Sequence, residues 1–299
     1  MRKRIGVIDI GNLKVKLEIV EVKQGKVVSL YASNTLTCLG LRMNENNNRP
    51  WRENLKKTIE ELKRCRRILG EHGIDETRVV STHALREMGA TGVKVAKKIE
   101  KEAGLRVEII SQKEEAELFF KAVTHRWPGE EELTIVDVGS GSVQELLGNR
   151  KKLKQDHLLK MGAQYLHDTF SPRHGGGDSP TEEEILRMRR YILQHLACLP
   201  AGIKTPVVYG SSCIINLFQA LKLDNPAPVR QLERVLRKVA PMPYDEREKK
   251  YPFEQKYYMW GVDKALLIVT QLARRVAAPW VIPTNANINQ GLILGLVER

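Results

Sequence analysis

The 299-residue sequence has few cysteines and no long apolar run. Its four cysteines, Cys38, Cys65, Cys198 and Cys213, form no C-x-x-C pair and have no histidine at metal-ligand spacing. We therefore expect reduced, mostly buried thiols rather than a disulfide framework or a zinc site. No apolar stretch approaches the roughly 20 residues that span a bilayer, and the first one ends at Asp9, too soon for a signal peptide. These absences predict a cytoplasmic protein with no membrane partner.

Acidic residues are in deficit, because 49 Lys and Arg stand against 36 Asp and Glu, which gives a net charge of +13. Such an excess attracts polyanions, whether nucleic acid, polyphosphate or highly phosphorylated nucleotides. Glutamate is interleaved in several of the basic clusters, so a single cluster is also consistent with a solvated helix face. The chain carries no helix-turn-helix, zinc-finger or ribonucleoprotein motif. A polyanionic partner is favoured, and nucleic acid is the weaker alternative.

Two segments repeat one pattern, a strand followed by an Asp-x-Gly turn and a second strand. They are IGVIDIGNLKVKLEI (5–19) and LTIVDVGSGSVQELL (133–147). A single Asp-x-Gly is weak support, since both residues are common in turns, but two copies that each open a series of strands and helices indicate duplication. The repeat predicts two α/β domains, 1–125 and 126–299, with the segment 288–299 packing back on the first domain. We expect their two turns to face one cleft.

Local patterns add three predictions. The strand over 14–19 alternates apolar and polar residues, and it should bend or end where the alternation breaks at Val20. The helix before Gly104 should end at that glycine. Ser179 and Glu182 fit the S/T-x-x-E capping box of a helix start.

With these motifs in order, the sequence resembles the exopolyphosphatase/guanosine pentaphosphate phosphohydrolase (Ppx/GppA) family of the actin-like ATPase superfamily. The resemblance covers most of the chain, and its most specific segments are THALRE and the IISQKEEA stretch. It implies an α/β fold of two ribonuclease-H-like domains with mixed sheets flanked by helices. The segments that carry it are VIDIG (7–11), CLGL (38–41), VVSTHALRE (79–87), EIISQKEEAELFF (108–120), IVDVGSGSV (135–143), KMGA (160–163), GSS (210–212) and QGLILGL (290–296).

The resemblance also implies the residues of a site. A glutamate of the Glu-Glu-Ala segment, Glu115, would activate water, and Arg86 would support it nearby. Asp9 and Asp137 would lie at a Mg²⁺ ion. The phosphate-binding residues would be Gly11, Asn12, Lys14, Gly139, Ser140, Gly141 and Ser142.

These residue types suit that chemistry. Glycine lets backbone N–H groups converge on phosphate oxygens where a Cβ would obstruct them, and aspartates at strand ends suit a hard cation such as Mg²⁺. The alternative for each aspartate is a hydrogen bond within its own turn. Glu114 and Glu115 point about 100° apart on a helix, and Ser111 with Glu114 fits a capping box, which leaves Glu115 to position water. Arg86 could clamp phosphate or be an ordinary surface arginine.

The cleft motifs also depart from the family pattern. The first turn reads D-I-G-N-L-K instead of D-x-G-S-N-S, so that Leu13 cannot donate and Lys14 adds a charge. In the second turn Gln144 replaces an acidic residue, which Glu145 does not restore because a shift of one residue along a strand points to the opposite face. The remaining departures are Ser140 for glycine, Val143 and Cys213 for threonine, and Asn289 and Gln290 for a charged pair.

The sequence therefore supports two main readings. The first is a Mg²⁺-dependent phosphohydrolase that releases terminal phosphate from inorganic polyphosphate or guanosine pentaphosphate by Glu-assisted attack of water. The second is a catalytically impaired relative that binds polyphosphate, guanosine penta- or tetraphosphate, or a protein partner in a regulatory role. A nucleic-acid binder and a kinase of the same superfamily are weaker alternatives, a homodimer is left open, and the length predicts a short two-domain form.

Overall fold

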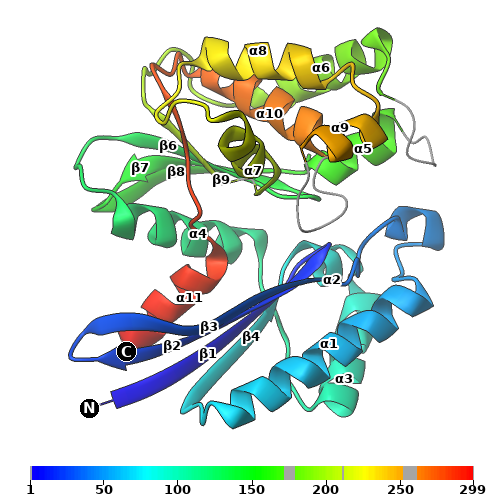
Figure 1. Ribbon diagram of the computed structural model, residues 1–299, viewed down its shortest axis with the longest axis vertical. Coiled ribbons are helices and arrows are strands. Elements are labelled where there is room, and N and C mark those ends of the chain that lie inside the picture. The colour runs from blue at the N-terminus through cyan, green and yellow to red at the C-terminus, as the bar shows by residue number, and fades with distance from the viewer. Residues whose placement is uncertain (1, 172–178, 211, 252–260, 299) are drawn as a thin grey trace. The chain divides into compact units, whose positions relative to one another are not determined.

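The chain divides into two compact units, each built on a five-stranded sheet (Figure 1). The computed structural model describes residues 2–171, 179–210, 212–251 and 261–298, with the backbone alone at 212 and 213. Unit 1 comprises Met1–Ala122 and Asn287–Arg299, and unit 2 comprises Val123–Ala286. Each unit is described by itself.

The sheet of unit 1 has the strand order β3-β2-β1-β4-β5. Its first three strands, β1 (Arg2–Ile10), β2 (Lys14–Lys23) and β3 (Lys26–Leu36), are antiparallel, whereas β4 (Glu76–Ser81) and β5 (Glu108–Ile109) continue the sheet in parallel with β1. The predicted bend in the second strand is confirmed as a shift of register between Ile19 and Val20. The strand continues beyond it to Lys23, because a bulge turns a strand without ending it.

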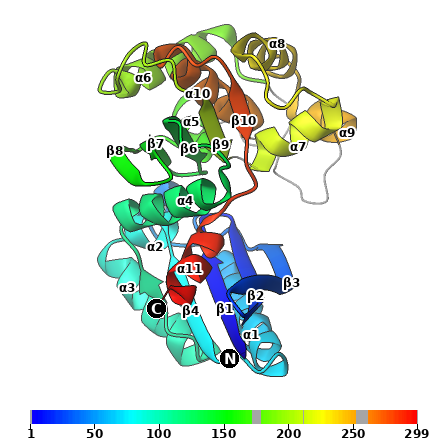
Figure 2. The same cartoon turned by 90° about the vertical axis from the view of Figure 1, so that its left-hand side faces the viewer.

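Helices cover both faces of this sheet. Helices α1 (Arg52–Glu71) and α3 (Ala90–Ala103) pack together on one face, and α11 (Ile288–Val297) packs against β1 and β2 on the other (Figure 2). The core between the sheet and α1 and α3 is aliphatic, with Ile8 and Leu17 from the sheet and Leu62 and Ile99 from the helices all fully or almost fully buried. Gly104 (φ 64°) ends α3 in the left-handed conformation, as predicted. The helices of unit 1 are η1 (Met43–Asn46), α1 (Arg52–Glu71), α2 (His83–Glu87), α3 (Ala90–Ala103), α4 (Gln112–Arg126), whose last four residues belong to unit 2, and α11 (Ile288–Val297).

Unit 2 repeats the topology of unit 1. Its sheet has the order β10-β9-β6-β7-β8, which is the order of unit 1 read strand for strand from the opposite edge. Again the first three strands are antiparallel and the last two are parallel to the first. The strands are β6 (Leu133–Val138), β7 (Val143–Asn149), β8 (Lys152–Leu159), β9 (Val207–Gly210) and β10 (Val281–Pro283). The duplication inferred from the two Asp-x-Gly turns therefore extends to the whole sheet.

The helices of unit 2 are α5 (Ala163–Phe170), α6 (Glu182–Leu196), α7 (Ser212–Leu221), α8 (Val229–Val239), α9 (Tyr244–Lys250) and α10 (Val262–Arg275). The central one is α10, which contacts α5, α6, α7, α8 and β6. The predicted capping box at Ser179 and Glu182 is wrong. Helix α6 is capped two residues later by Thr181, whose side chain accepts from Glu184 N while the Glu184 carboxylate accepts from Thr181 N. Both pairs fit the S/T-x-x-E pattern, and the helix begins where the second pair places it.

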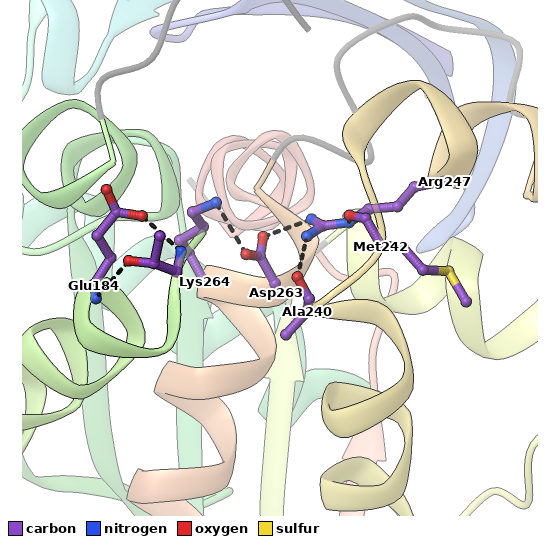
Figure 3. A network of polar contacts seen from close by, with 7 residues as sticks. Glu184, Ala240, Met242, Arg247, Asp263 and Lys264 are labelled. Atoms are coloured by element: carbon purple, nitrogen blue, oxygen red, sulfur yellow. Dashed lines mark hydrogen bonds and ion pairs between the residues drawn. The ribbon is translucent and has the colours of Figure 1, made fainter. Parts of the chain in front are cut away.

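Unit 2 also contains a buried network of charges (Figure 3). Asp263 accepts from Arg247 Nη1 at 2.9 Å and from Lys264 Nζ at 2.9 Å, and all three side chains are at most 4% exposed. Arg247 also donates to the carbonyl oxygens of Ala240 and Met242. Burial opposes ionisation of Asp263, but the two cations outweigh it and hold the pKa of Asp263 below its ordinary value. The network joins α9 to the first turn of α10.

The cysteines fit the sequence prediction in part. No disulfide joins Cys38, Cys65 and Cys198, the three whose side chains are described, but Cys65 is buried, Cys38 half-buried and Cys198 exposed. The prediction of mostly buried thiols is thus wrong for Cys198, which follows the last turn of α6 on the surface. The Cys213 side chain lies outside the described residues. Among the helices that the structure describes, none is long and apolar enough to cross a bilayer.

Candidate active site

The two Asp-x-Gly turns have the same hairpin geometry. In unit 1, Asp9 pairs with Lys16 across β1 and β2, and the turn is closed by Gly11 N, which donates to Lys14 O at 2.8 Å. In unit 2, the matching bond is donated by Gly139 N to the Ser142 carbonyl at 3.0 Å. The equivalent pairs are Asp9 and Asp137, Gly11 and Gly139, Lys14 and Ser142, and Lys16 and Gln144.

Backbone carbonyls of the first turn are held by the segment that follows β3. Thr37 N and Cys38 N donate to Leu13 O at 3.0 and 2.9 Å, and Gly40 N donates to Asn12 O at 2.9 Å. A Cβ at Gly40 would overlap the end of the Asn12 side chain, so glycine allows this close approach without moving that side chain. The CLGL segment therefore serves to hold the first turn.

The start of α5 holds the second turn in the same way. Ala163 N donates to Gly139 O at 3.0 Å, and the next two backbone N–H groups donate to Ser140 O at 2.8 and 3.1 Å. A Cβ at Gly162 would overlap the Ser140 carbonyl and the Gly141 nitrogen. The KMGA segment thus places the N-terminus of α5 against the turn, where its first amides are used internally.

Several backbone amides of the two turns differ from the carbonyls in having no hydrogen-bond partner among the described residues. In the described part of the chain, the N–H groups of Asn12, Leu13, Ser140 and Gly141 donate to no protein acceptor. Successive N–H groups without a protein acceptor in a turn form a concave site for an anion. Each turn can therefore bind phosphate oxygens through its backbone, and the loss of the asparagine amide at Leu13 removes only a side-chain contribution.

Asp9 lies buried at the end of β1, with 4% of its surface exposed. Its Oδ2 lies 3.5 Å from Lys16 Nζ, and its Oδ1 is buried and has no hydrogen-bond partner among the described residues. Burial raises the pKa of Asp9, and the ammonium of Lys16 opposes that rise. Because its Oδ1 has no hydrogen-bond partner among the described residues, Asp9 can act as a ligand for a metal cation.

Asp137 is half-buried and has an interaction partner. Gln144, opposite it on β7, is 1% exposed and donates to Ser142 Oγ at 3.1 Å. Its neighbour Glu145 is fully buried and lies 2.7 Å from His157 Nδ1 on β8. The two side chains have different partners because successive residues of a strand point to opposite faces. Glu145 does not replace the lost acid.

Parallel strands bring three of the predicted residues to one edge of the sheet in unit 1. Asp9 lies at the end of β1, Arg86 lies on α2 directly after β4, and Glu115 lies on α4 directly after β5. Because β1, β4 and β5 are parallel, their carboxyl ends meet at the same edge, which is where open α/β sheets bind ligands.

Arg86 and Glu115 are directly paired. Arg86 Nη2 lies 2.9 Å from Glu115 Oε2, and Arg86 Nη1 donates to Ile110 O at 3.1 Å. Glu115 is 9% exposed and makes further interactions. The Arg86–Glu115 contact is an ion pair without hydrogen-bond geometry, and the bond to Ile110 O holds the guanidinium next to the end of β5.

Glu114 has a separate role. Its backbone N donates to Ser111 Oγ at 3.0 Å, as the predicted capping box requires, but its carboxylate accepts from Arg78 Nη2 at 2.7 Å instead of from the cap. Only half of the box is thus formed. The adjacent glutamates engage different arginines, since neighbouring helical residues point about 100° apart.

Sequence reasoning missed Lys16. The residue belongs to the alternating face of β2, and only the hairpin register places it opposite Asp9. Asn289 of α11 also reaches this hairpin, since its Nδ2 lies 3.4 Å from Lys16 O and the residue is 2% exposed. Asn289, which replaces a charged residue of the family pattern, therefore contacts the first hairpin.

The acidic groups form no complete metal site by themselves. In the described ranges, no three His, Cys, Asp or Glu side chains come together closely enough to hold a metal ion. Mg²⁺ is commonly held by one or two carboxylates together with substrate phosphates and water. A single buried carboxylate with one unpartnered oxygen, as at Asp9, fits that mode.

Solved structures share this fold. An exopolyphosphatase from Cytophaga hutchinsonii superposes with a TM-score of 0.88 at 22% identity, covering 99% of this chain and 98% of that one. The Aquifex aeolicus Ppx/GppA family member gives a TM-score of 0.83 at 22% identity, covering 100% of this chain and 98% of that one. Identity this low shows the fold alone, which is the actin-like fold of two α/β domains with mixed sheets, as the resemblance implied.

The curated relatives are longer than this chain, and each matches it over only part of its length. Exopolyphosphatase 1 of Mycobacterium leprae is 24% identical over 196 residues, which are 65% of this chain and 56% of that protein. A bifunctional 3-dehydroquinate synthase/phosphatase of Fusobacterium nucleatum is 26% identical over 172 residues, or 54% of this chain and 26% of that protein. The chain thus spans 56% and 26% of the lengths of these relatives. The profile of the Ppx/GppA phosphatase family matches residues 18–248, most of the sequence, and the chain belongs to that family.

Proposed function

We propose that the protein is a phosphohydrolase that removes the terminal phosphate of inorganic polyphosphate, with guanosine pentaphosphate as the alternative substrate. The single observation that carries this proposal is the set of turn amides at Asn12, Leu13, Ser140 and Gly141, which have no acceptor in the described protein. The family and its exopolyphosphatase relatives support the same substrate class.

The proposed reaction is attack of water on the terminal phosphorus. Glu115 orients the water and takes its proton, the bond from phosphorus to the bridging oxygen breaks, and inorganic phosphate leaves the shortened chain. Arg86 holds the Glu115 carboxylate in place through the 2.9 Å ion pair. Amides of Gly-containing turns bind the phosphate oxygens as negative charge spreads over them. The residues Gly11, Lys14, Gly139 and Ser142 complete the proposed phosphate contacts.

Mg²⁺ is the proposed cofactor. When bound, it would neutralise charge on the phosphate oxygens, and Asp9 and Asp137 are the residues proposed to contact it. Asp9 offers the unpartnered Oδ1 described above. The proposed location is the cytoplasm.

One specific observation favours a second function, binding without turnover. Gln144 stands where the family pattern of the second turn has an acidic residue, and its side chain donates to Ser142 Oγ. A protein with intact amide turns and a weakened metal site would bind a phosphate chain and release no phosphate. Its role would then be regulatory, through the bound polyanion or a protein partner.

Phosphate release from long-chain polyphosphate and from guanosine pentaphosphate, each with Mg²⁺, separates these functions. Glu115→Gln should lower the rate by about 10²-fold or more, since it removes the general base. Glu114→Gln is the matched control, because the neighbouring carboxylate engages Arg78 instead, and its rate should change little. Tight polyphosphate binding with no release from the unmodified protein would establish the binding function instead.

A further inference from the structure

The duplicated hairpins differ at the position opposite the first aspartate of each turn. Lys16 in unit 1 and Gln144 in unit 2 are equivalent, each opposite an aspartate of the neighbouring strand. Gln144 donates to Ser142 and carries no charge. Lys16 instead places its Nζ 3.5 Å from Asp9 Oδ2. The first hairpin therefore contains its own cation.

Asp9 needs such a cation. An ionised carboxylate that is 4% exposed is costly to bury unless an opposite charge or several hydrogen bonds accompany it. Asp9 has the Lys16 ammonium on one oxygen and no hydrogen-bond partner among the described residues on the other. Lys16 is itself about one-third exposed, at 34% of its side chain, so the ammonium can move without unfolding the strand. Lys16 therefore stabilises the ionised Asp9 carboxylate, and its ammonium can still move away from it.

A divalent cation at Asp9 would meet this ammonium. Two like charges a few ångströms apart repel strongly in the partly buried interior, where the effective dielectric constant is about 20. A metal bound to Oδ1 would lie on the same carboxylate as the ammonium on Oδ2. The single negative charge of the Asp9 carboxylate cannot neutralise the metal ion and the Lys16 ammonium together.

We propose that Lys16 is a tethered counter-cation that competes with divalent metal for Asp9 and so keeps the metal affinity of unit 1 low. This proposal rests on the metal role given to Asp9 in the proposed function. Lys16 would then determine how tightly the metal binds, acting through Asp9. The first hairpin has a positive charge at this position, whereas the second hairpin has the neutral amide of Gln144.

The test is a Mn²⁺ titration of the full chain without any phosphate compound, with free Mn²⁺ measured by electron paramagnetic resonance. The variants are Lys16→Met, Lys16→Gln, Lys16→Arg, Asp9→Asn and the double variant Lys16→Met/Asp9→Asn. Removing the charge should create one Mn²⁺ site at least about tenfold tighter than in the unmodified protein. Lys16→Arg should behave as the unmodified protein, and the double variant should lose the new site.

Two results would overturn the proposal. One is a tighter Mn²⁺ site in Lys16→Met that persists in the double variant, and the other is no gain of affinity in both Lys16→Met and Lys16→Gln. Lys16→Gln is included because its amide can still donate to the buried carboxylate if Lys16→Met proves unstable. A rise in melting temperature with Mn²⁺ in the neutral variants alone is the second readout. Since no phosphate compound is used, failure here is distinct from failure of the hydrolase proposal, which the phosphate-release assay decides.

Discussion

Arg86 Nη2 lies 2.9 Å from Glu115 Oε2, and this ion pair joins α2 to the first turn of α4 in unit 1. Both helices begin at the carboxyl ends of parallel strands, so the pair lies at the edge of the sheet that also carries Asp9. The arginine also donates a hydrogen bond to the Ile110 carbonyl. The position of Arg86 explains how the Glu115 side chain on α4 is held in one orientation.

The first prediction concerns that arginine. Arg86→Ala should lower polyphosphate hydrolysis by about 10-fold or more, because Glu115 loses the group that positions it. The 9% exposed carboxylate would also lose its cation, so the melting temperature should fall. Arg86→Lys should restore stability better than activity, since a lysine cannot reach both Glu115 and Ile110 with one planar group. Equal recovery of kcat/KM and melting temperature in Arg86→Lys would contradict a positioning role.

A second prediction compares two glycines that hold the turns. At Gly162 an added Cβ would overlap backbone atoms of Ser140 and Gly141, whereas at Gly40 it would overlap the end of the Asn12 side chain. A side chain can rotate away and a turn backbone cannot, so Gly162→Ala should cost about 1–3 kcal/mol and Gly40→Ala less. Gly162→Ala should also weaken polyphosphate binding, measured by calorimetry. A larger loss in Gly40→Ala than in Gly162→Ala would contradict this account.

The buried network of unit 2 gives a third prediction. Asp263→Asn should destabilise the protein by about 3–5 kcal/mol in denaturant titrations, because Arg247 and Lys264 would be left buried without their anion. The pKa of Asp263 is lower in the folded chain than its ordinary value of 3.8. Its stabilisation is therefore complete above pH 3.8 and is lost as the pH falls through the folded pKa.

The matched control for this network is an exposed pair. Lys151 and Glu130 form an ion pair whose side chains are 72% and 76% exposed, so Glu130→Gln should change stability little. Stability of Asp263→Asn should also depend less on pH than that of the unmodified protein in the acid range. An Asp263→Asn variant as stable as Glu130→Gln would show that the network contributes nothing.

A fourth prediction restores an acid to the second hairpin. Gln144→Glu would place a carboxylate opposite Asp137 at a position that is 1% exposed. Without metal the buried charge should lower the melting temperature, and Mg²⁺ should recover part of the loss, because binding to the native state alone stabilises it. Scanning calorimetry with and without Mg²⁺ measures this. If Mg²⁺ raises the melting temperature of both proteins equally, position 144 has no part in metal binding.

The sequence predicted the architecture well because the architecture rests on local patterns. The repeated Asp-x-Gly hairpins, the alternation over 14–19 and the glycine that ends α3 each depend on residues close together in the chain. The helix start at α6 was placed two residues early for the same reason, since two overlapping S/T-x-x-E matches are locally equivalent and only the packed helix selects Thr181.

What the sequence by itself determined is therefore the fold, the duplication and the residue types suited to phosphate. Pairing between distant segments decided the rest. Only the register of β1 and β2 placed Lys16 beside Asp9, and only the packed helices of unit 2 buried Arg247 with Asp263. Such contacts join residues that no periodicity relates, because burial, distance and charge pairing are properties of the folded chain.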